Sequence, residues 1–224
     1  MHITVLIPAR GGSKGIPEKN ILKICDKPLI LYSIEYALSC SLINDVVVST
    51  DDKKIAKLSM DSGAKIINRP YEFATDTAST ESVITHFMDN IDTKPDIIVI
   101  LQPTSPIRPK NSLEFALKHF LSKKFDSLLS ISPTHHFFWN IKRENAIPNY
   151  DFMNRPRRQD FTKEDISYLE NGSLYIFTSK HFKKIKNRLG GKIGYVIFPE
   201  DYSIQLDSKL DIDILEKTLK NLTS

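Results

Sequence analysis

Short apolar runs rich in β-branched residues alternate with helix-patterned segments through the first 132 residues. The expected strands are Ile3–Pro8, Asp45–Ser49, Lys65–Ile67, Asp96–Leu101 and Ser127–Ser132. Between them, apolar residues recur at helical spacing over Leu29–Cys40, Lys53–Asp61, Ser79–Asn90 and Ser112–Ser122. This alternation predicts an α/β protein with three αβα layers, in which a mostly parallel sheet is covered by helices on both faces.

The pattern changes after about Pro133. Residues 135–139 are mostly aromatic, and residues 155–158 read Arg-Pro-Arg-Arg. The later elements are expected at Ser173–Phe177, Tyr195–Phe198 and Leu210–Leu222. We therefore expect one domain over residues 1–224, from which about residues 134–169 leave the core as a lid or a pairing arm.

Composition sets limits on the partners. The chain has 31 basic and 27 acidic residues, and its net charge of +4 is too mild to indicate nucleic acid, although it suits acidic small substrates. Cys25 and Cys40 have no metal or redox spacing, which favours a reduced compartment. No apolar stretch is long enough to span a bilayer, and the N-terminal one is too short for a signal peptide. We expect a cytoplasmic protein without a membrane partner.

One loop carries the clearest chemical signal. Residues 7–21 read IPARGGSKGIPEKNI, so the first expected strand leads into three glycines and three cations: Gly11, Gly12, Gly15, Arg10, Lys14 and Lys19. Glycine permits φ > 0 and a close approach to a ligand, and the cations supply the charge that a triphosphate needs. The spacing is neither a Walker loop nor a dinucleotide fingerprint. The loop is a candidate nucleotide-phosphate site, and an ordinary strand-to-helix turn is the alternative.

Polar residues follow other expected strands as well. Asp51, Gln102 and Thr104 all follow strand ends, where ligands of parallel sheets bind, so with Arg10 they are expected to face one crevice. The turn LQPTSPIR at 101–108 is held by two prolines, and we expect it to present Ser105 and Arg108 too. The stretch 68–80 is a second polar connection, in which Asp76 or Ser79 is a candidate helix cap.

Two later segments complete the candidates. The basic run RPRRQD at 155–160 is followed by ENGSLY at 170–175, and arginine binds carboxylate or phosphate in a bidentate way. A solvated basic face or a nucleic-acid patch is the alternative. In SIQLDSKLD at 203–211, Asp207 ends an expected strand and could present a carboxylate to Mg²⁺, or it could cap a helix.

Taken together, these motifs resemble the acylneuraminate cytidylyltransferases over nearly the whole chain. The resemblance rests on their order and spacing: IPARGGSKGIPEKNI, VSTD at 48–51, the 69–80 stretch, LQPTSPIR, RPRRQD, ENGSLYIF at 170–177 and SIQLD at 203–207. It implies a nucleotide-diphospho-sugar transferase (Rossmann-like) fold and a homodimer whose arm reaches the partner's site. It also implies transfer of CMP from CTP to the anomeric hydroxyl of a nonulosonic acid, an acidic nine-carbon sugar, with release of pyrophosphate and with Mg²⁺ as cofactor.

The resemblance also implies roles for individual residues. Arg10 and Lys19 would grip the triphosphate with Asp207 as a third catalytic residue, and the nucleotide side would further include Gly11, Gly12, Ser13, Asn20, Arg69 and Thr80. Gln102 and Tyr175 would line the sugar pocket, and Arg157 would anchor the sugar carboxylate. The metal ligand would be Asp207. The family usually has a second aspartate two residues earlier, where this chain has Gln205, a doubtful ligand.

Three alternatives stay open at this stage. The acidic sugar could be legionaminate, pseudaminate, KDN or Kdo. Gln205 is the only support for a catalytically weak homologue that binds nucleotide sugars. The basic cluster at 155–158 is the only support for a nucleic-acid binder, and it lacks the interleaved aromatic residues and broad positive stripe of such proteins.

Overall fold

The first strand lies near the centre of a single large sheet. The computed structural model describes residues 1–162 and 166–223. Seven strands pair in the order β11-β7-β10-β6-β1-β4-β5. Their bounds are β1 (Ile3–Pro8), β4 (Asp45–Thr50), β5 (Lys65–Asn68), β6 (Ile97–Leu101), β7 (Ser127–Thr134), β10 (Ser167–Thr178) and β11 (Ile193–Ile197). Strand β1 runs parallel to both of its neighbours, β4 and β6.

One strand runs against the others. Strand β10 pairs antiparallel with β6 on one side and with β7 on the other, while β11 is parallel to β7. Strand β10 is twelve residues long and begins six residues before the expected Ser173. Its pairing with β7 shifts register between Glu170 and Tyr175. The expectation of a mostly parallel sheet is confirmed, with β10 as the exception.

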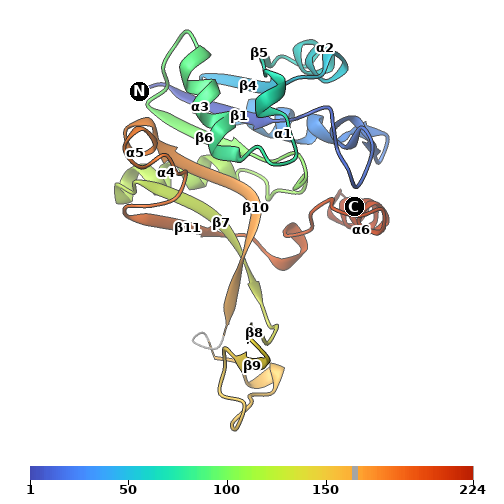
Figure 1. Ribbon diagram of the computed structural model, residues 1–224, viewed down its shortest axis with the longest axis vertical. Helices are drawn as coiled ribbons and strands as arrows, with labels where there is room; N and C mark the ends of the chain where they lie inside the picture. The colour runs from blue at the N-terminus through green and yellow to red at the C-terminus, as the bar shows by residue number, and fades with distance from the viewer. Residues whose placement is uncertain (163–165, 224) are drawn as a thin grey trace.

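Helices cover both faces of the sheet. Their bounds are α1 (Leu29–Leu38), α2 (Lys53–Asp61), α3 (Thr80–Asn90), α4 (Ser112–Lys123), α5 (Ser179–Ile185) and α6 (Leu210–Thr223). Side chains of β6 alternate between the two cores: Val99 packs with α1, α2 and α4, and Ile98 packs with α3 and α5. Figure 1 shows the resulting three layers. The strands are apolar on both faces because both are buried.

Smaller elements lie outside the large sheet. Two short pairs of strands are β2 (Lys23–Ile24) with β3 (Lys27–Pro28) and β8 (Trp139–Lys142) with β9 (Asn145–Pro148). Four 3-10 turns are η1 (Lys19–Ile21), η2 (Tyr71–Phe73), η3 (Arg158–Asp160) and η4 (Glu200–Tyr202). No helix among the described ranges is long and apolar enough to cross a membrane.

The chain leaves the core between β7 and β10. Both strands extend outward, and Figure 1 shows β8 and β9 at the far end of the projecting segment. The predicted bounds of 134–169 include the end of β7 at Thr134 and the start of β10 at Ser167. Residues 163–165 of this segment lie outside the described residues. We call residues 135–166 the arm.

The strand order places a crevice beside β1. From β1 the chain continues outward through β4 and β5, and it then returns to β6 on the opposite side of β1. Where the direction of winding reverses, the loops that follow neighbouring strands separate and leave room for a ligand. The loops after β1 and β6 therefore flank the expected ligand position.

Candidate functional site

A cavity of about 270 Å³ opens at this position. It is lined by residues that follow β1, β5 and β6, by η1 and by the beginning of α3: Pro8, Arg10, Gly12, Ser13, Lys19, Asn20, Arg69, Ala78, Ser79, Thr80, Val83, Gln102, Pro103 and Thr104. Eight of the thirteen predicted site residues are in this lining. Gly11, Arg157, Tyr175, Gln205 and Asp207 are not.

The glycines of the loop act differently from expectation. None of Gly11, Gly12 and Gly15 has a positive φ. The N–H group of Gly11 donates to Asp51 Oδ1 at 2.9 Å, and a Cβ on Gly11 would lie 2.7 Å from Cβ of Asp52. Gly11 is therefore required by close packing against the beginning of α2, and its amide is already paired. The expectation that these glycines supply φ > 0 is wrong, and the residue of the loop that does have a positive φ is Glu18.

Arg10 and Lys14 share one carboxylate. Arg10 Nη1 lies 2.8 Å from Asp76 Oδ1, and Lys14 Nζ lies 2.9 Å from Asp76 Oδ2. The hydrogen bonds from Lys14 and Arg10 hold the pKa of Asp76 below its ordinary value. Asn20 fixes the loop, because its Nδ2 donates to the carbonyl of Arg10 at 2.8 Å. Arg10 and Lys14 are thus positioned to bind an anion, and in this structure the Asp76 carboxylate is the anion that they contact.

Lys19 reaches the C-terminal segment. Its Nζ donates to the carbonyl of Leu206 at 2.9 Å and lies 3.6 Å from Asp207 Oδ1. The Lys19 side chain is 15% exposed and that of Asp207 is 72% exposed. The lysine is held by the backbone, and the neighbouring carboxylate remains accessible to a ligand.

Arg69 and Thr80 also line the cavity. The Arg69 guanidinium is buried and donates to the hydroxyl of Ser49 at 3.1 Å and to the carbonyl of the same residue. Burial lowers the pKa of Arg69 to about 10. Thr80 is the first residue of α3, and the preceding Ser79 caps the helix by accepting from the N–H of Ser82 at 3.1 Å.

The turn after β6 divides its polar residues between the cavity and the core. Gln102 and Thr104 line the cavity. Arg108 is buried and donates to the carbonyls of Gln102 and Ser173, while Ser105 donates to the carbonyl of Asn171. The expectation that Ser105 and Arg108 are presented to a ligand is wrong, because they join the turn to β10.

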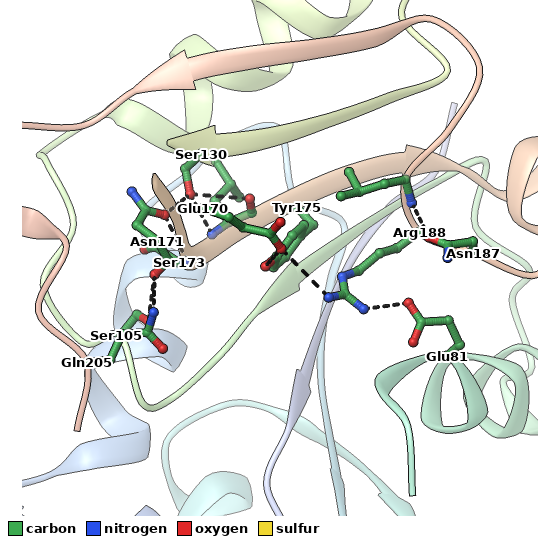
Figure 2. A network of polar contacts seen from close by, with 12 residues as sticks. Glu81, Ser105, Ser130, Glu170, Asn171, Ser173, Tyr175, Asn187, Arg188 and Gln205 are labelled. Carbon is green, nitrogen blue, oxygen red and sulfur yellow. Dashed lines mark hydrogen bonds and ion pairs between the residues drawn. The ribbon is translucent and has the colours of Figure 1, made fainter. Parts of the chain in front are cut away.

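Gln205 does not lie on a strand. Residues 203–208 are irregular, because the N–H of Leu206 donates to the Thr104 carbonyl, and the N–H groups of Asp207 and Ser208 donate to the Asp211 carboxylate. The Gln205 amide donates to the Asn171 carbonyl at 3.1 Å, as Figure 2 shows. The expectation that Asp207 ends a strand is therefore wrong.

Tyr175 is buried on β10, outside the cavity lining. Its hydroxyl donates to Glu170 Oε1 at 2.5 Å, and Arg188 lies over its ring (Figure 2). Burial and the hydrogen bond to Glu170 raise the pKa of Tyr175. The sequence predicted Tyr175 but missed the two residues that hold it.

Arg157 lies on the arm, away from the cavity in the same chain. Its side chain is 74% exposed and pairs with Asp160. It lines a separate open hollow of about 890 Å³ together with Arg155, Trp139 and Tyr150. Within one chain, the structure does not bring Arg157 together with Arg10 and Lys19.

The fold and the cavity define a class. A parallel α/β sheet whose first strand leads into a basic loop, with the cavity at the winding reversal, is typical of nucleotide-binding proteins. The family model for cytidylyltransferases matches residues 4–221, and the chain belongs to that family. The resemblance drawn from the motifs is thereby confirmed.

Curated relatives carry two kinds of name. The chain is 35% identical to N-acylneuraminate cytidylyltransferase of Oncorhynchus mykiss, over 96% of this chain and 50% of that protein. It is 30% identical to N-acylneuraminate cytidylyltransferase of Escherichia coli, over 95% of this chain and 51% of that protein. It is 29% identical to pseudaminic acid cytidylyltransferase of Campylobacter jejuni, over 93% and 92% of the two chains. The chain thus spans about half the length of the N-acylneuraminate relatives.

Solved structures show the same fold. CMP:2-keto-3-deoxy-manno-octonic acid synthetase complexed with CTP superposes with a TM-score of 0.74 at 16% identity, over 99% of this chain and 100% of that chain. The 4-diphosphocytidyl-2C-methyl-D-erythritol synthase of Anaerococcus prevotii superposes with a TM-score of 0.69 at 11% identity, over 98% of both. At these identities the likeness concerns the fold alone, and it confirms the expected Rossmann-like α/β architecture.

Proposed function

We propose that the protein transfers CMP from CTP to the anomeric hydroxyl of a nonulosonic acid and releases pyrophosphate. The observation that carries the proposal is the gathering of Arg10, Lys19, Arg69 and Thr80 around one cavity in a chain of the cytidylyltransferase family. Two cations on one wall suit a triphosphate, and the beginning of α3 with Arg69 suits the nucleoside. Gln102, at the turn after β6, would then bind the sugar.

The chemistry is phosphoryl-group transfer by in-line displacement. The sugar hydroxyl oxygen attacks the α-phosphorus of CTP, loses its proton, and displaces pyrophosphate. The protein contributes mainly position and charge, since negative charge shifts toward the leaving pyrophosphate. Lys19 is suited to stabilise that charge because its Nζ is already fixed by the Leu206 carbonyl.

Mg²⁺ is part of this proposal. Among the described residues, no three His, Cys, Asp or Glu side chains come together as a metal cluster. A magnesium–nucleotide site needs fewer, because Mg²⁺ usually binds one or two carboxylates together with phosphate oxygens and water. The exposed Asp207 carboxylate beside Lys19 fits that requirement. When bound, the ion supplies further positive charge to the phosphates.

The proposed activity is tested by measuring pyrophosphate release with each of the four nucleoside triphosphates and a panel of nonulosonic acids. We expect CTP to be preferred and EDTA to stop turnover, because the triphosphate charge must be offset before an oxyanion approaches phosphorus. Equal rates with ATP, or full activity in EDTA, would contradict the proposal.

Pseudaminic acid is the second candidate sugar. The chain covers 92% of the pseudaminic acid enzyme of Campylobacter jejuni, whereas it covers 50% of the fish N-acylneuraminate enzyme. The same assay separates the two sugars, with legionaminate, KDN and Kdo included in the panel.

The two free cysteines, Cys25 and Cys40, support a cytoplasmic location.

A homodimer is also proposed. Strand β11 is an edge strand, and its outward residues Ile193, Tyr195 and Ile197 are each about half exposed. Tyr195 pairs with Leu129 and Ile197 with Ile131, so they continue one apolar face. Helices α3 and α5 cover this face of the sheet over β1, β4, β6 and β10. A continuous apolar surface of this kind is typical of an interface, and a second copy would also bring its arm into reach.

Arg157→Ala should raise the KM for the sugar strongly and change kcat less, because a carboxylate anchor contributes mostly uniform binding. If the arm acts in the partner's site, Arg157→Ala and Lys19→Ala subunits should complement each other after mixing and exchange. The assay uses a sugar concentration well below the KM of Arg157→Ala, at which both parent dimers are nearly inactive. Half of random dimers are then mixed and have one intact site, which gives roughly a quarter of wild-type activity. No recovery, or sedimentation as monomer only at micromolar concentration, would contradict the shared site.

Asp76→Asn should tighten CTP binding by about threefold at low ionic strength, because Asp76 competes with phosphate for Arg10 and Lys14. The effect should shrink as salt screens the exposed charges. Titration calorimetry at two salt concentrations measures it. Asp92→Asn, an exposed aspartate outside the cavity lining, is the control. Unchanged affinity in Asp76→Asn would show that the ion pair does not compete with phosphate.

A further inference from the structure

Figure 2 shows a charged cluster that joins three distant parts of the chain. Arg188 lies in the loop between α5 and β11, and its Nη1 is 2.5 Å from Glu81 Oε1. Its Nη2 is 3.9 Å from Glu170 Oε1, and its Cζ lies 4.6 Å from the centre of the Tyr175 ring. The Arg188 side chain is 19% exposed. One guanidinium therefore contacts α3 and β10 at the same time.

The contact on α3 is next to the cavity lining, and the contact on β10 holds Tyr175, which the resemblance assigns to the sugar pocket. Glu81 is the second residue of α3 and directly follows Thr80, which lines the cavity. Glu170 accepts a hydrogen bond from the Tyr175 hydroxyl at 2.5 Å. Arg188 therefore contacts Tyr175 directly, over the ring, and indirectly, through Glu170. The raised pKa of Tyr175 keeps the phenol protonated and therefore a donor.

The Arg188 backbone is itself well fixed. Leu189 packs against the core that contains Tyr175 and α3, and its N–H donates to Asn187 Oδ1 at 2.8 Å. The N–H of Gly190 donates to the hydroxyl of Ser127 at 3.0 Å. The guanidinium thus extends from a loop that is attached to the core directly after Arg188, as a positioning group requires.

The cluster is poorly suited to a purely stabilising role. One cation faces two carboxylates, and the buried Nε atom of Arg188 has no hydrogen-bond partner in the described part of the chain. Charged groups that are largely removed from water recover little net stability even when well paired. An arrangement of this kind is better explained by the geometry it imposes.

We propose that Arg188 is a positioning residue that fixes the beginning of α3, on the nucleotide side, relative to Tyr175, on the sugar side. The inference rests on the proposed function and deepens it by naming the group that sets the distance between the two substrates. Arg188 acts on the site through Glu81 and Glu170, and the substrate-facing cations Lys19 and Arg10 belong to other contacts. Small displacements of bound reactants reduce the rate strongly, even when affinity is kept.

The test uses Arg188→Met, Glu81→Gln and the double variant in the intact protein. We expect Arg188→Met to lower kcat at least about tenfold while the Kd for CTP stays within about threefold. The double variant should be no slower than Arg188→Met, because both changes break one linkage. Arg188→Lys should recover part of the loss. The pair Lys118→Met and Glu114→Gln, an exposed ion pair on α4, should leave kcat unchanged.

Wild-type kcat in either single variant overturns the proposal, and so do independent, additive losses in the double variant. If Arg188→Met does not fold, the isosteric Glu81→Gln decides. Amide hydrogen exchange provides a readout without turnover: both variants should exchange faster at residues 79–84 and 170–176, and unchanged exchange there also overturns the proposal. A wild-type protein that releases no pyrophosphate with any sugar contradicts the proposed function instead, and the exchange data then decide on the linkage.

Discussion

Replacing Lys19 by alanine should lower kcat by at least about a hundredfold, because a fixed cation at developing charge is worth roughly 3 kcal/mol or more. The Lys19 Nζ is already held at the cavity by the Leu206 carbonyl at 2.9 Å. The loss should fall on kcat more than on the KM for CTP, since the developing charge exists only in the transition state. Steady-state pyrophosphate release measures both constants.

A matched lysine serves as the control. Lys54 pairs with Glu18 of the same loop but lies outside the cavity lining, and Lys54→Ala should leave kcat close to wild type. The melting temperature of each variant should be recorded, because Lys19 also holds the C-terminal segment. A Lys19→Ala variant that keeps both the melting temperature and the kcat of the wild type would exclude Lys19 as the transition-state cation.

Features that depend on neighbouring residues were predictable from the sequence. The strands and helices follow from periodic patterns, and the loop after β1 contains its own cations, so Arg10, Lys19 and Asn20 were expected close together, and they line one cavity. Gln102 and Thr104 follow β6, and the strand order brings that turn beside β1. In a parallel sheet the residues that follow neighbouring strands lie close together, so this part of a site can be predicted from the sequence.

Features that depend on distant pairings were not predictable. Glu81 and Arg188 are 107 residues apart, and neither belongs to a motif. The strand expected to end at Asp207 does not form, because the N–H groups of Leu206 and Asp207 donate to Thr104 and Asp211, not to a neighbouring strand. The glycines of the first loop were assigned the wrong cause, since Gly11 is set by contact with Asp52. In each case the deciding partner lies far away along the chain or outside the motif.

Asp207→Asn should largely abolish turnover and raise the Mg²⁺ concentration for half-maximal rate. The substitution keeps the shape and one oxygen of the side chain but removes the charge that a hard dication prefers. The side chain is 72% exposed, and it is Asp211 that accepts the N–H groups of Asp207 and Ser208. The fold should therefore tolerate the change, and a Mg²⁺ titration of the rate isolates the metal effect. Asp201→Asn, on η4, is the matched control.

Gln205→Asp separates a metal ligand from a structural amide. In the structure, the Gln205 amide donates to the Asn171 carbonyl, and an aspartate there would set a carboxylate against an acceptor and lose the hydrogen bond. We therefore expect a lower melting temperature and an unchanged Mg²⁺ requirement. If the Mg²⁺ requirement instead falls, position 205 faces the metal when substrates are bound, and the side chain must turn away from Asn171. With Asp207→Asn unchanged in the same titration, neither residue would be a metal ligand, and the last motif would serve only to hold Lys19.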